Sequence, residues 1–175
     1  ELIAAGGIRN LTIRNLADRL GLTEPAIYRH FRNKAEIVRT LIGEFDRGIP
    51  EASPERTGFE AVAAFTRSRF TQVAAQPPLA KVLFAEEHFI EEPEFARLLL
   101  DMMHRHREKL GKHFREAQSS GEIRTDIPEE MLFRLVFGPV RLLVKQWGLS
   151  DGAFDLREKG EELIRVLRIL LAPGS

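Results

Sequence analysis

The stretch LTIRNLADRLGLTEPAIYRHFRNKAEIV, residues 11–38, decides the fold of the first part of the chain. Apolar residues recur at helical spacing from Ile13 to Leu20, and Thr12 stands where an N-cap hydroxyl would accept from first-turn amides. Gly21 can adopt the left-handed conformation that ends a helix. The pattern therefore predicts a helix over 13–20 that is followed by a tight turn.

A second short helix is predicted directly after this turn. Thr23 is its candidate N-cap, Pro25 lies in its first turn, and Ile27 and Phe31 form one apolar face. Asn33 can cap a third helix, whose apolar stripe is Ile37, Val38, Leu41, Ile42 and Phe45. Two short helices joined by a tight glycine turn form a helix-turn-helix, whose second helix lies in the major groove of DNA.

The outward face of the second helix has the chemistry that DNA binding needs. It consists of Thr23, Glu24, Ala26, Tyr28, Arg29, His30 and Arg32. Tyr and His donate to phosphate oxygens, Arg adds charge, and the small Ala26 permits close approach or contact with a thymine methyl. Lys34 can offer its ammonium and nearby first-turn amides to one phosphate. The alternatives are that Tyr28 packs half-buried, that His30 caps a helix end, and that the arginines are simply solvated.

The charge distribution agrees with a polyanion partner at one end of the chain. Residues 9–39 contain seven Lys or Arg and three acidic residues, whereas residues 49–175 contain 18 basic and 20 acidic residues. The first segment therefore has a net charge of +4 although the whole chain has a formal net charge of 0. A basic head on a mildly acidic body is typical of nucleic-acid-binding proteins.

Composition limits the other function classes. The 175 residues are 43% hydrophobic and 30% charged, which suits one or two globular domains. No cysteine is present, so disulfides, thiolate catalysis and cysteine zinc sites are excluded. Without a long apolar run or a signal peptide, we expect a cytoplasmic protein with no membrane partner. Because the chain begins at Glu1 within a helix-like run, we also expect that some N-terminal sequence is missing.

Helical periodicity continues to the end of the chain, so the predicted fold class is all-α. The segment GIPEASPERTG, residues 48–58, has two prolines, two glycines and no apolar period. It predicts a linker between a helix-turn-helix domain, residues 1–47, and a helical domain, residues 59–175. Within the second domain, helices are predicted over 59–75, 79–89, 94–119, 129–147 and 154–171.

The first 46 residues resemble the DNA-binding head of TetR-type repressors. That family has a turn followed by a Tyr-x-His-Phe recognition helix and an Asn-Lys helix start, which stand here as Tyr28-Arg29-His30-Phe31 and Asn33-Lys34. The first family helix is mostly missing here, so its contacts are undecided. Glu24 is acidic in a groove-facing position, where it would suit a cytosine amino group. The resemblance implies phosphate contacts from Thr12, Tyr28, His30 and Lys34, and base or groove contacts from Arg14, Thr23, Glu24, Pro25, Ala26 and Tyr28.

The helix predicted over 94–119 carries an apolar stripe that includes His106, with His113 at its edge and His104 on the polar side. His106 is either a hydrogen-bonded core residue or the polar handle of a ligand pocket. For the second alternative, an apolar effector site is predicted from Phe65, Phe70, Phe84, Met102, Met103 and His106. Asp101 and His104 lack a second matching pair, so we predict no metal site and no cofactor.

The last two predicted helices are too apolar for one-sided surface helices. We expect one side to pack on the core and the other on the same pair in a second subunit, which would give a homodimer. Burial within a monomer is the alternative, whereas the TetR resemblance independently implies a dimer. The predicted interface residues are Val136, Val140, Leu143, Trp147, Ile164, Leu167 and Leu171.

These features together predict a transcriptional regulator that binds double-stranded DNA at a quasi-palindromic operator. The family resemblance favours a repressor that a small hydrophobic effector releases. The alternative is a helical DNA-binding regulator or architectural protein without such an effector. We predict no enzyme and no catalytic residue, because no nucleophile–base pair, phosphate loop or metal set stands in the sequence.

Overall fold

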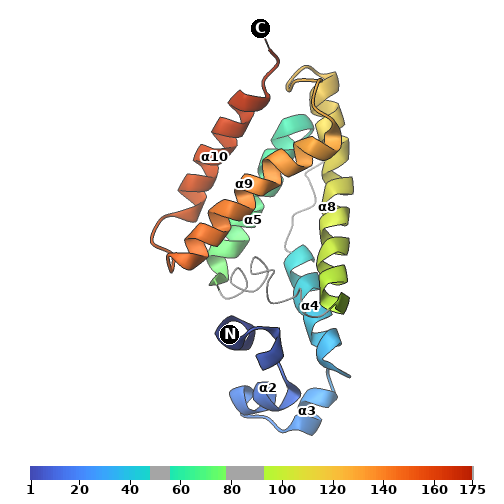
Figure 1. Ribbon diagram of the computed structural model, residues 1–175, viewed down its shortest axis with the longest axis vertical. Coiled ribbons are helices and arrows are strands. Elements are labelled where there is room, and N and C mark those ends of the chain that lie inside the picture. The colour runs from blue at the N-terminus through green and yellow to red at the C-terminus, as the bar shows by residue number, and fades with distance from the viewer. Residues whose placement is uncertain (48–55, 78–92, 175) are drawn as a thin grey trace. The chain divides into compact units, whose positions relative to one another are not determined.

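The computed structural model describes residues 1–47, 56–77 and 93–174, and every regular element in these ranges is a helix (Figure 1). The predicted all-α class is therefore confirmed. The helix predicted over 79–89, which contains Phe84, lies outside the described residues. Contacts divide the chain into two compact units, Glu1–Arg47 with Pro78–Met102 and Gly48–Pro77 with Met103–Ser175. The linear division into domains 1–47 and 59–175 stays a prediction.

The first unit contains the three helices predicted for the head, and two short elements precede them. In chain order these elements are α1 (Leu2–Gly6), the 3-10 turn η1 (Ile8–Asn10), α2 (Ile13–Leu20), α3 (Glu24–Tyr28) and α4 (Lys34–Arg47). Within this unit α1 packs against η1, and α2 packs against α3. Its buried apolar side chains come from each of these elements and include Ile3, Ile8, Leu11, Ala17, Ile27, Val38 and Ile42.

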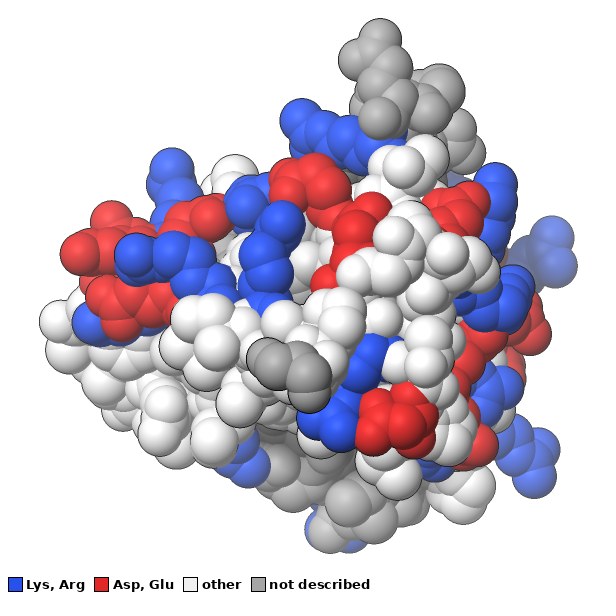
Figure 2. All heavy atoms as spheres, turned by 90° about the horizontal axis from the view of Figure 1, so that it is seen from above, with Lys and Arg blue, Asp and Glu red and all other residues white. Residues whose placement is uncertain are grey.

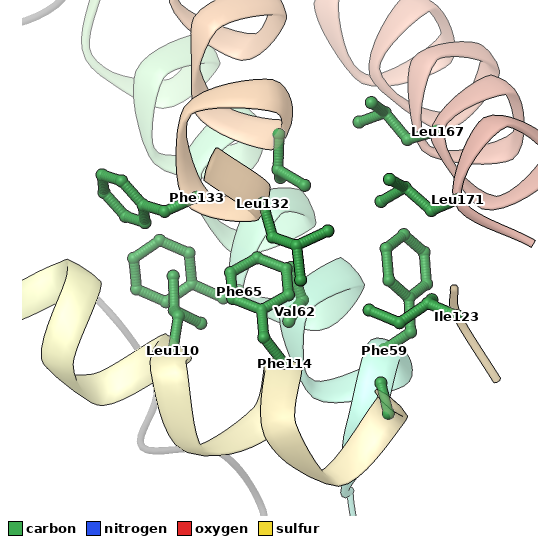
Figure 3. Packing of buried hydrophobic residues seen from close by; sticks show 12 residues of the cluster. Phe59, Val62, Phe65, Leu110, Phe114, Ile123, Leu132, Phe133, Leu167 and Leu171 are labelled. Carbon is green, nitrogen blue, oxygen red and sulfur yellow. The ribbon is translucent and has the colours of Figure 1, made fainter. Parts of the chain in front are cut away.

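The second unit is built from longer helices: α5 (Gly58–Ala75), the part of α8 (Pro93–Ser119) from Met103 onward, α9 (Glu129–Leu149) and α10 (Leu156–Leu171). Helix α10 packs against both α5 and α9 (Figure 1). Figure 3 shows how aromatic and aliphatic side chains from all four helices meet in one cluster. The cluster consists of Phe59, Val62, Phe65, Leu110, Phe114, Ala117, Ile123, Leu132, Phe133, Val136, Leu167 and Leu171.

Two carboxylates fix the start of α5 to the end of α8. The Phe59 N–H donates to Glu122 Oε2 at 3.0 Å, and the Gly58 N–H donates to Glu116 Oε2 at 3.3 Å. Negative charge at a helix N-terminus is favourable because the first amides have no partner within the helix. A hydrogen bond from His113, with a smaller contribution from the Gly58 N–H, holds the pKa of the Glu116 carboxyl below its usual range. The two helix ends are thereby tied together.

Helices α5 and α10 approach closely because Gly160 has no side chain. A Cβ added at Gly160 would overlap with the ring of Phe70, which is 1% exposed. On the surface of the same pair, Glu60 accepts from Arg67 at 2.7 Å and from Arg168 at 2.9 Å. Exposed ion pairs of this kind contribute little each. The close contact of Gly160 with Phe70 is therefore the feature that sets the distance between these helices.

The predicted helix ends agree with the structure to within about two residues, which is normal for helix boundaries. Helix α10 begins at Leu156, after the predicted residue 154, because the Asp155 carboxylate caps it. Its Oδ1 accepts from the N–H groups of Arg157 at 2.8 Å and Glu158 at 3.1 Å. None of the described helices has both the length and the apolar composition needed to cross a membrane.

Candidate nucleic-acid interface

Local hydrogen bonds fix both ends of α2. Thr12 Oγ1 accepts from the Asn15 N–H at 3.0 Å, as an N-cap does. At the other end Gly21 has φ 65° and ψ 31°, the left-handed conformation. The Leu22 N–H then donates to the Ala17 carbonyl at 2.9 Å, which closes the helix. The predicted cap and the predicted glycine stop of α2 are both confirmed.

Two asparagine side chains tie α2 to the elements that precede it. Asn15 Nδ2 donates to the Asn10 backbone oxygen at 2.9 Å and to Asn10 Oδ1 at 3.0 Å. Asn10 Nδ2 in turn donates to the Leu2 oxygen at 2.9 Å. Sequence reasoning missed this chain of bonds, because an asparagine on a short helix carries no periodic signal. Its effect is to orient the α2–α3 pair on α1 and η1.

Helix α3 presents the predicted polar face to solvent. Thr23 occupies the N-cap position, but its side chain makes no capping hydrogen bond. Ile27 is 3% exposed and points inward, whereas Tyr28 is 53% exposed. That exposure argues against the alternative that Tyr28 is a half-buried packing residue. Ala26 is half-buried, and the exposed side chains of this face are Thr23, Glu24, Pro25, Tyr28, Arg29, His30 and Arg32.

The start of α4 is capped as predicted. Asn33 Oδ1 accepts from the Glu36 N–H at 2.9 Å, and the Glu36 carboxylate reaches back to the Arg32 N–H at 2.6 Å. Lys34 is the first residue of the helix, and its Nζ lies 5.6 Å from the centroid of the Phe95 ring. Arg14, like Thr12, is exposed at the start of α2. Capping thus places Lys34 at the end of α4 that follows the recognition helix.

Some of the residues predicted for the effector site meet in the second unit. The rings of Phe65 and His106 are in edge contact with centroids 5.3 Å apart, and both side chains are buried. Arg69, which is 3% exposed, places Nη2 at 3.0 Å from His106 Nε2. A guanidinium can only donate, so Nε2 accepts and the ring is neutral with its hydrogen on Nδ1. His106 is therefore a hydrogen-bonded buried histidine.

The remaining predicted effector residues are distributed differently. Met103 is half-buried and its Sδ accepts from Arg141 Nη1 at 3.7 Å, while burial lowers the pKa of Arg141. Met102 is buried in the first unit, Phe70 packs at Gly160, and Phe84 lies outside the described residues. Among the described side chains, no group of three or more potential ligands is placed to hold a metal ion.

Sequence reasoning missed Arg69 as the partner of His106 and Arg141 as the partner of Met103. A signal for Arg69 was present, because it follows Val62, Phe65 and Thr66 on the same buried side of α5. A basic residue on a buried helix face needs a polar partner, and such a partner indicates a polar cluster inside the core.

The residues predicted for the subunit interface need correction. Within a single chain Val136, Val140, Trp147, Ile164, Leu167 and Leu171 are already buried, and Leu143 is half-buried. They pack inside the second unit because each helix turns its better-packed side to α5 and α8. The apolar residues of α9 and α10 that face solvent are a different set: Met131, Leu135, Leu142, Leu149, Val166, Ile169 and Leu170. We call this set the outer apolar face.

Figure 2 shows acidic and basic side chains interspersed over much of the visible surface, with a broad area at the lower left that carries neither. On α9, Leu135, Leu142 and Leu149 recur every seven residues, so they lie along one side of the helix. Exposed apolar side chains that gather on one side of a helix are typical of interaction sites. The outer apolar face is thus the candidate interface of this unit.

Comparison with known proteins supports this interpretation of the head. Residues 1–41 match the family model described as bacterial regulatory proteins, tetR family. The fatty acid metabolism regulator protein of Bacillus subtilis (strain 168) is 24% identical over 172 residues, which are 95% of this chain and 88% of that protein. The sequence likeness thus extends over nearly the whole length of both proteins.

Two solved structures have the same fold. The fatty acid degradation regulator FadR from Bacillus halodurans matches with a TM-score of 0.82 at 21% identity, over 95% of this chain and 89% of that one. The regulator FadR from Bacillus subtilis, solved in complex with stearoyl-CoA, matches with a TM-score of 0.80 at 22% identity, over 95% and 91%. Residues 1–41 thus match the TetR family of bacterial regulatory proteins, and the chain as a whole is similar in sequence and in fold to known transcriptional regulators.

Proposed function

We propose that this regulator is a homodimeric repressor that binds a quasi-palindromic operator and leaves it when a small, mostly hydrophobic effector binds. The observation that carries the proposal is the exposed surface of α3 and the turn after it, where Tyr28, Arg29 and His30 follow the small Ala26. Such a face combines phosphate donors with a place for close contact with bases.

The contacts to phosphate fit the hydrogen bonds within the head. The Thr12 oxygen accepts from Asn15, which leaves its O–H as a donor for a phosphate. Tyr28 is an exposed donor at the end of α3, His30 is an exposed donor in the turn after it, and Lys34 brings a cation to the start of α4. Arg14, Thr23, Glu24, Pro25 and Ala26 are the proposed contacts to base edges or the groove floor.

The two classes of contact should respond differently to mutation. Tyr28→Phe and Lys34→Ala should weaken binding to every duplex, and Lys34→Ala should also lower the salt slope by about 0.9 because one phosphate contact is lost. Arg14→Ala and Thr23→Ala should relax base preference by about 1–3 kcal/mol at a contacted position. Titrations of cognate and scrambled duplexes over a salt series measure both effects. Wild-type affinity in all four variants would contradict the assignment.

A dimer follows from the geometry of operator recognition. One short recognition helix reads only one half-site, so specific binding needs two heads whose spacing matches a helical turn of DNA or a multiple of it. The outer apolar face of α9 and α10 provides a surface for a second copy, in an isologous arrangement of two helix pairs. An isologous pairing of this face would produce a two-fold dimer and a quasi-palindromic site.

The proposed effector is mostly hydrophobic, with a carbonyl, hydroxyl or carboxylate that bonds to His106. In this proposal Phe65 and Met103 supply the apolar part of the site, and the imidazole of His106 supplies the polar part. An acyl compound fits this description. Since the FadR from Bacillus subtilis was solved in complex with stearoyl-CoA, stearoyl-CoA is the first compound to test on this chain.

His106→Leu should reduce effector affinity and spare DNA binding without effector. The substitution also removes this acceptor from the buried Arg69, which lowers the free energy of unfolding by about 1–3 kcal/mol. His106→Gln is the matched control, because an amide oxygen can still accept from Arg69. Calorimetric titration with stearoyl-CoA measures the affinity of both variants. Full effector affinity in His106→Leu would assign the histidine to the core alone.

The second candidate function is DNA binding that a partner protein controls, without a small effector. The bond between Arg69 and His106 favours it, because a purely structural histidine would use the same contact. A thermal-shift screen against small apolar compounds separates the two candidates, because a ligand that binds the native state raises the unfolding temperature. Coupling to DNA must also be reciprocal: a saturating effector weakens operator binding by the factor by which operator weakens effector binding.

A further inference from the structure

The first residues of α8 contact α4 within the first unit. The Lys34 ammonium lies over the Phe95 ring, 5.6 Å from its centroid, at a distance typical of cation–π contacts. One residue earlier, Glu94 Oε1 lies 3.4 Å from Arg39 Nη2. Phe95 itself is only 3% exposed. Two consecutive residues of α8 therefore engage two basic residues on α4.

We propose that Phe95 is a positioning residue for DNA binding, which holds Lys34 in the orientation that contacts a phosphate. This inference rests on the phosphate contact proposed for Lys34 above. A lysine side chain has four rotatable bonds, and fixing them costs conformational entropy when the ammonium binds. The Phe95 ring is buried and therefore immobile, so it restricts the lysine before DNA arrives.

The same contact makes DNA affinity depend on α8. Helix α8 begins at Pro93, so Glu94 and Phe95 lie in its first turn, in the same unit as Lys34. A change in the position of α8 thus alters the surface on which Lys34 rests. The Glu94–Arg39 pair is more than half exposed on both sides and adds little energy, so the buried ring is the part of the contact that matters.

The test measures operator affinity over a salt series for Lys34→Ala, Phe95→Leu, Phe95→Tyr and the double variant Phe95→Leu with Lys34→Ala. Phe95→Leu keeps an apolar side chain but removes the ring. It should lower affinity about 2- to 5-fold and reduce the salt slope toward that of Lys34→Ala. Phe95→Tyr keeps the ring and should retain the wild-type slope. The double variant should match Lys34→Ala, because both changes remove one interaction.

Phe114→Leu is the matched control, since it shortens another buried phenylalanine on α8 that belongs to the core cluster of the second unit. It should lower the unfolding temperature and leave the salt slope unchanged. Should Phe95→Leu prove too unstable to titrate, Phe95→Met removes the ring with an unbranched, flexible side chain that adapts to irregular space.

The outcomes separate this inference from the proposed DNA contact. An unchanged slope in Lys34→Ala would remove the phosphate contact and with it the role of Phe95. A lowered slope in Lys34→Ala with a wild-type slope in Phe95→Leu would overturn the positioning role alone. Tighter operator binding by Phe95→Leu would also overturn it, because the ring would then withhold the lysine from DNA.

Discussion

Replacing Leu142 or Ile169 by aspartate should convert the proposed dimer into monomers and lower operator affinity at least about 100-fold. Leu142 is 57% exposed and Ile169 is 74% exposed in the single chain, so neither change disturbs the core. In a dimer formed through the outer apolar face, the carboxylate would be buried without a partner at the subunit seam. Sedimentation measures the assembly, and titration of a two-half-site operator measures the affinity.

Two further variants make this result specific. Leu142→Met keeps an apolar side chain and should leave both dimer and affinity intact. Leu167→Asp places the charge at a residue that is 5% exposed within its own chain, so it should unfold the second unit without producing a folded monomer. A wild-type chain that sediments as a monomer at micromolar concentration would contradict the dimer. If Leu142→Asp and Ile169→Asp both remain dimers, the seam lies elsewhere.

Gly160→Ala should destabilise the second unit by about 1–3 kcal/mol, because the new methyl group enters the space of the Phe70 ring. For a chain of this size the change corresponds to a fall of roughly 2–12 °C in unfolding temperature. The direction is diagnostic, because Gly→Ala inside a helix with open space normally stabilises by about 0.5–1 kcal/mol. Thermal unfolding followed by circular dichroism measures the shift.

The close contact predicts a specific rescue. Phe70→Leu alone should destabilise the protein because it leaves a cavity, but the pair Gly160→Ala with Phe70→Leu should be less destabilised than the sum of the two. Gly43→Ala on α4 is the control, since no described atom lies within 4 Å of a Cβ at that position. A Gly160→Ala protein as stable as wild type would show that α5 and α10 do not depend on this glycine.

The structure of the head follows from local interactions that a sequence displays directly. Thr12 and Asn15, like Asn33 and Glu36, are three residues apart, and Gly21 ends α2 through its own backbone conformation. Capping and left-handed turns involve neighbours within about five residues, so their residue types and spacing suffice to predict them. The family resemblance rested on the same residues and was confirmed by the match over residues 1–41.

The candidate effector cluster could be predicted only in part. The buried stripe of α8 was predicted from its helical period, and His106 lies on it as expected. Its partner Arg69 is 37 residues earlier on another helix, and the ring that faces Lys34 is Phe95. No period connects residues on different helices, so such pairs become visible only when the helices are packed. The close contact between Gly160 and Phe70 also joins two different helices, so the sequence alone does not reveal it.

The sequence alone determined that this is an all-helical regulator with a helix-turn-helix head and two unusually apolar final helices. Tertiary structure alone decided which side of those helices is covered. Val140 and Leu167 are buried within the chain, so Leu142 and Ile169 replace them as candidate residues of the subunit interface. The reason is physical: hydrophobic periodicity selects one buried side when the other side is polar. When both sides are apolar, only packing against α5 and α8 determines which side faces the core.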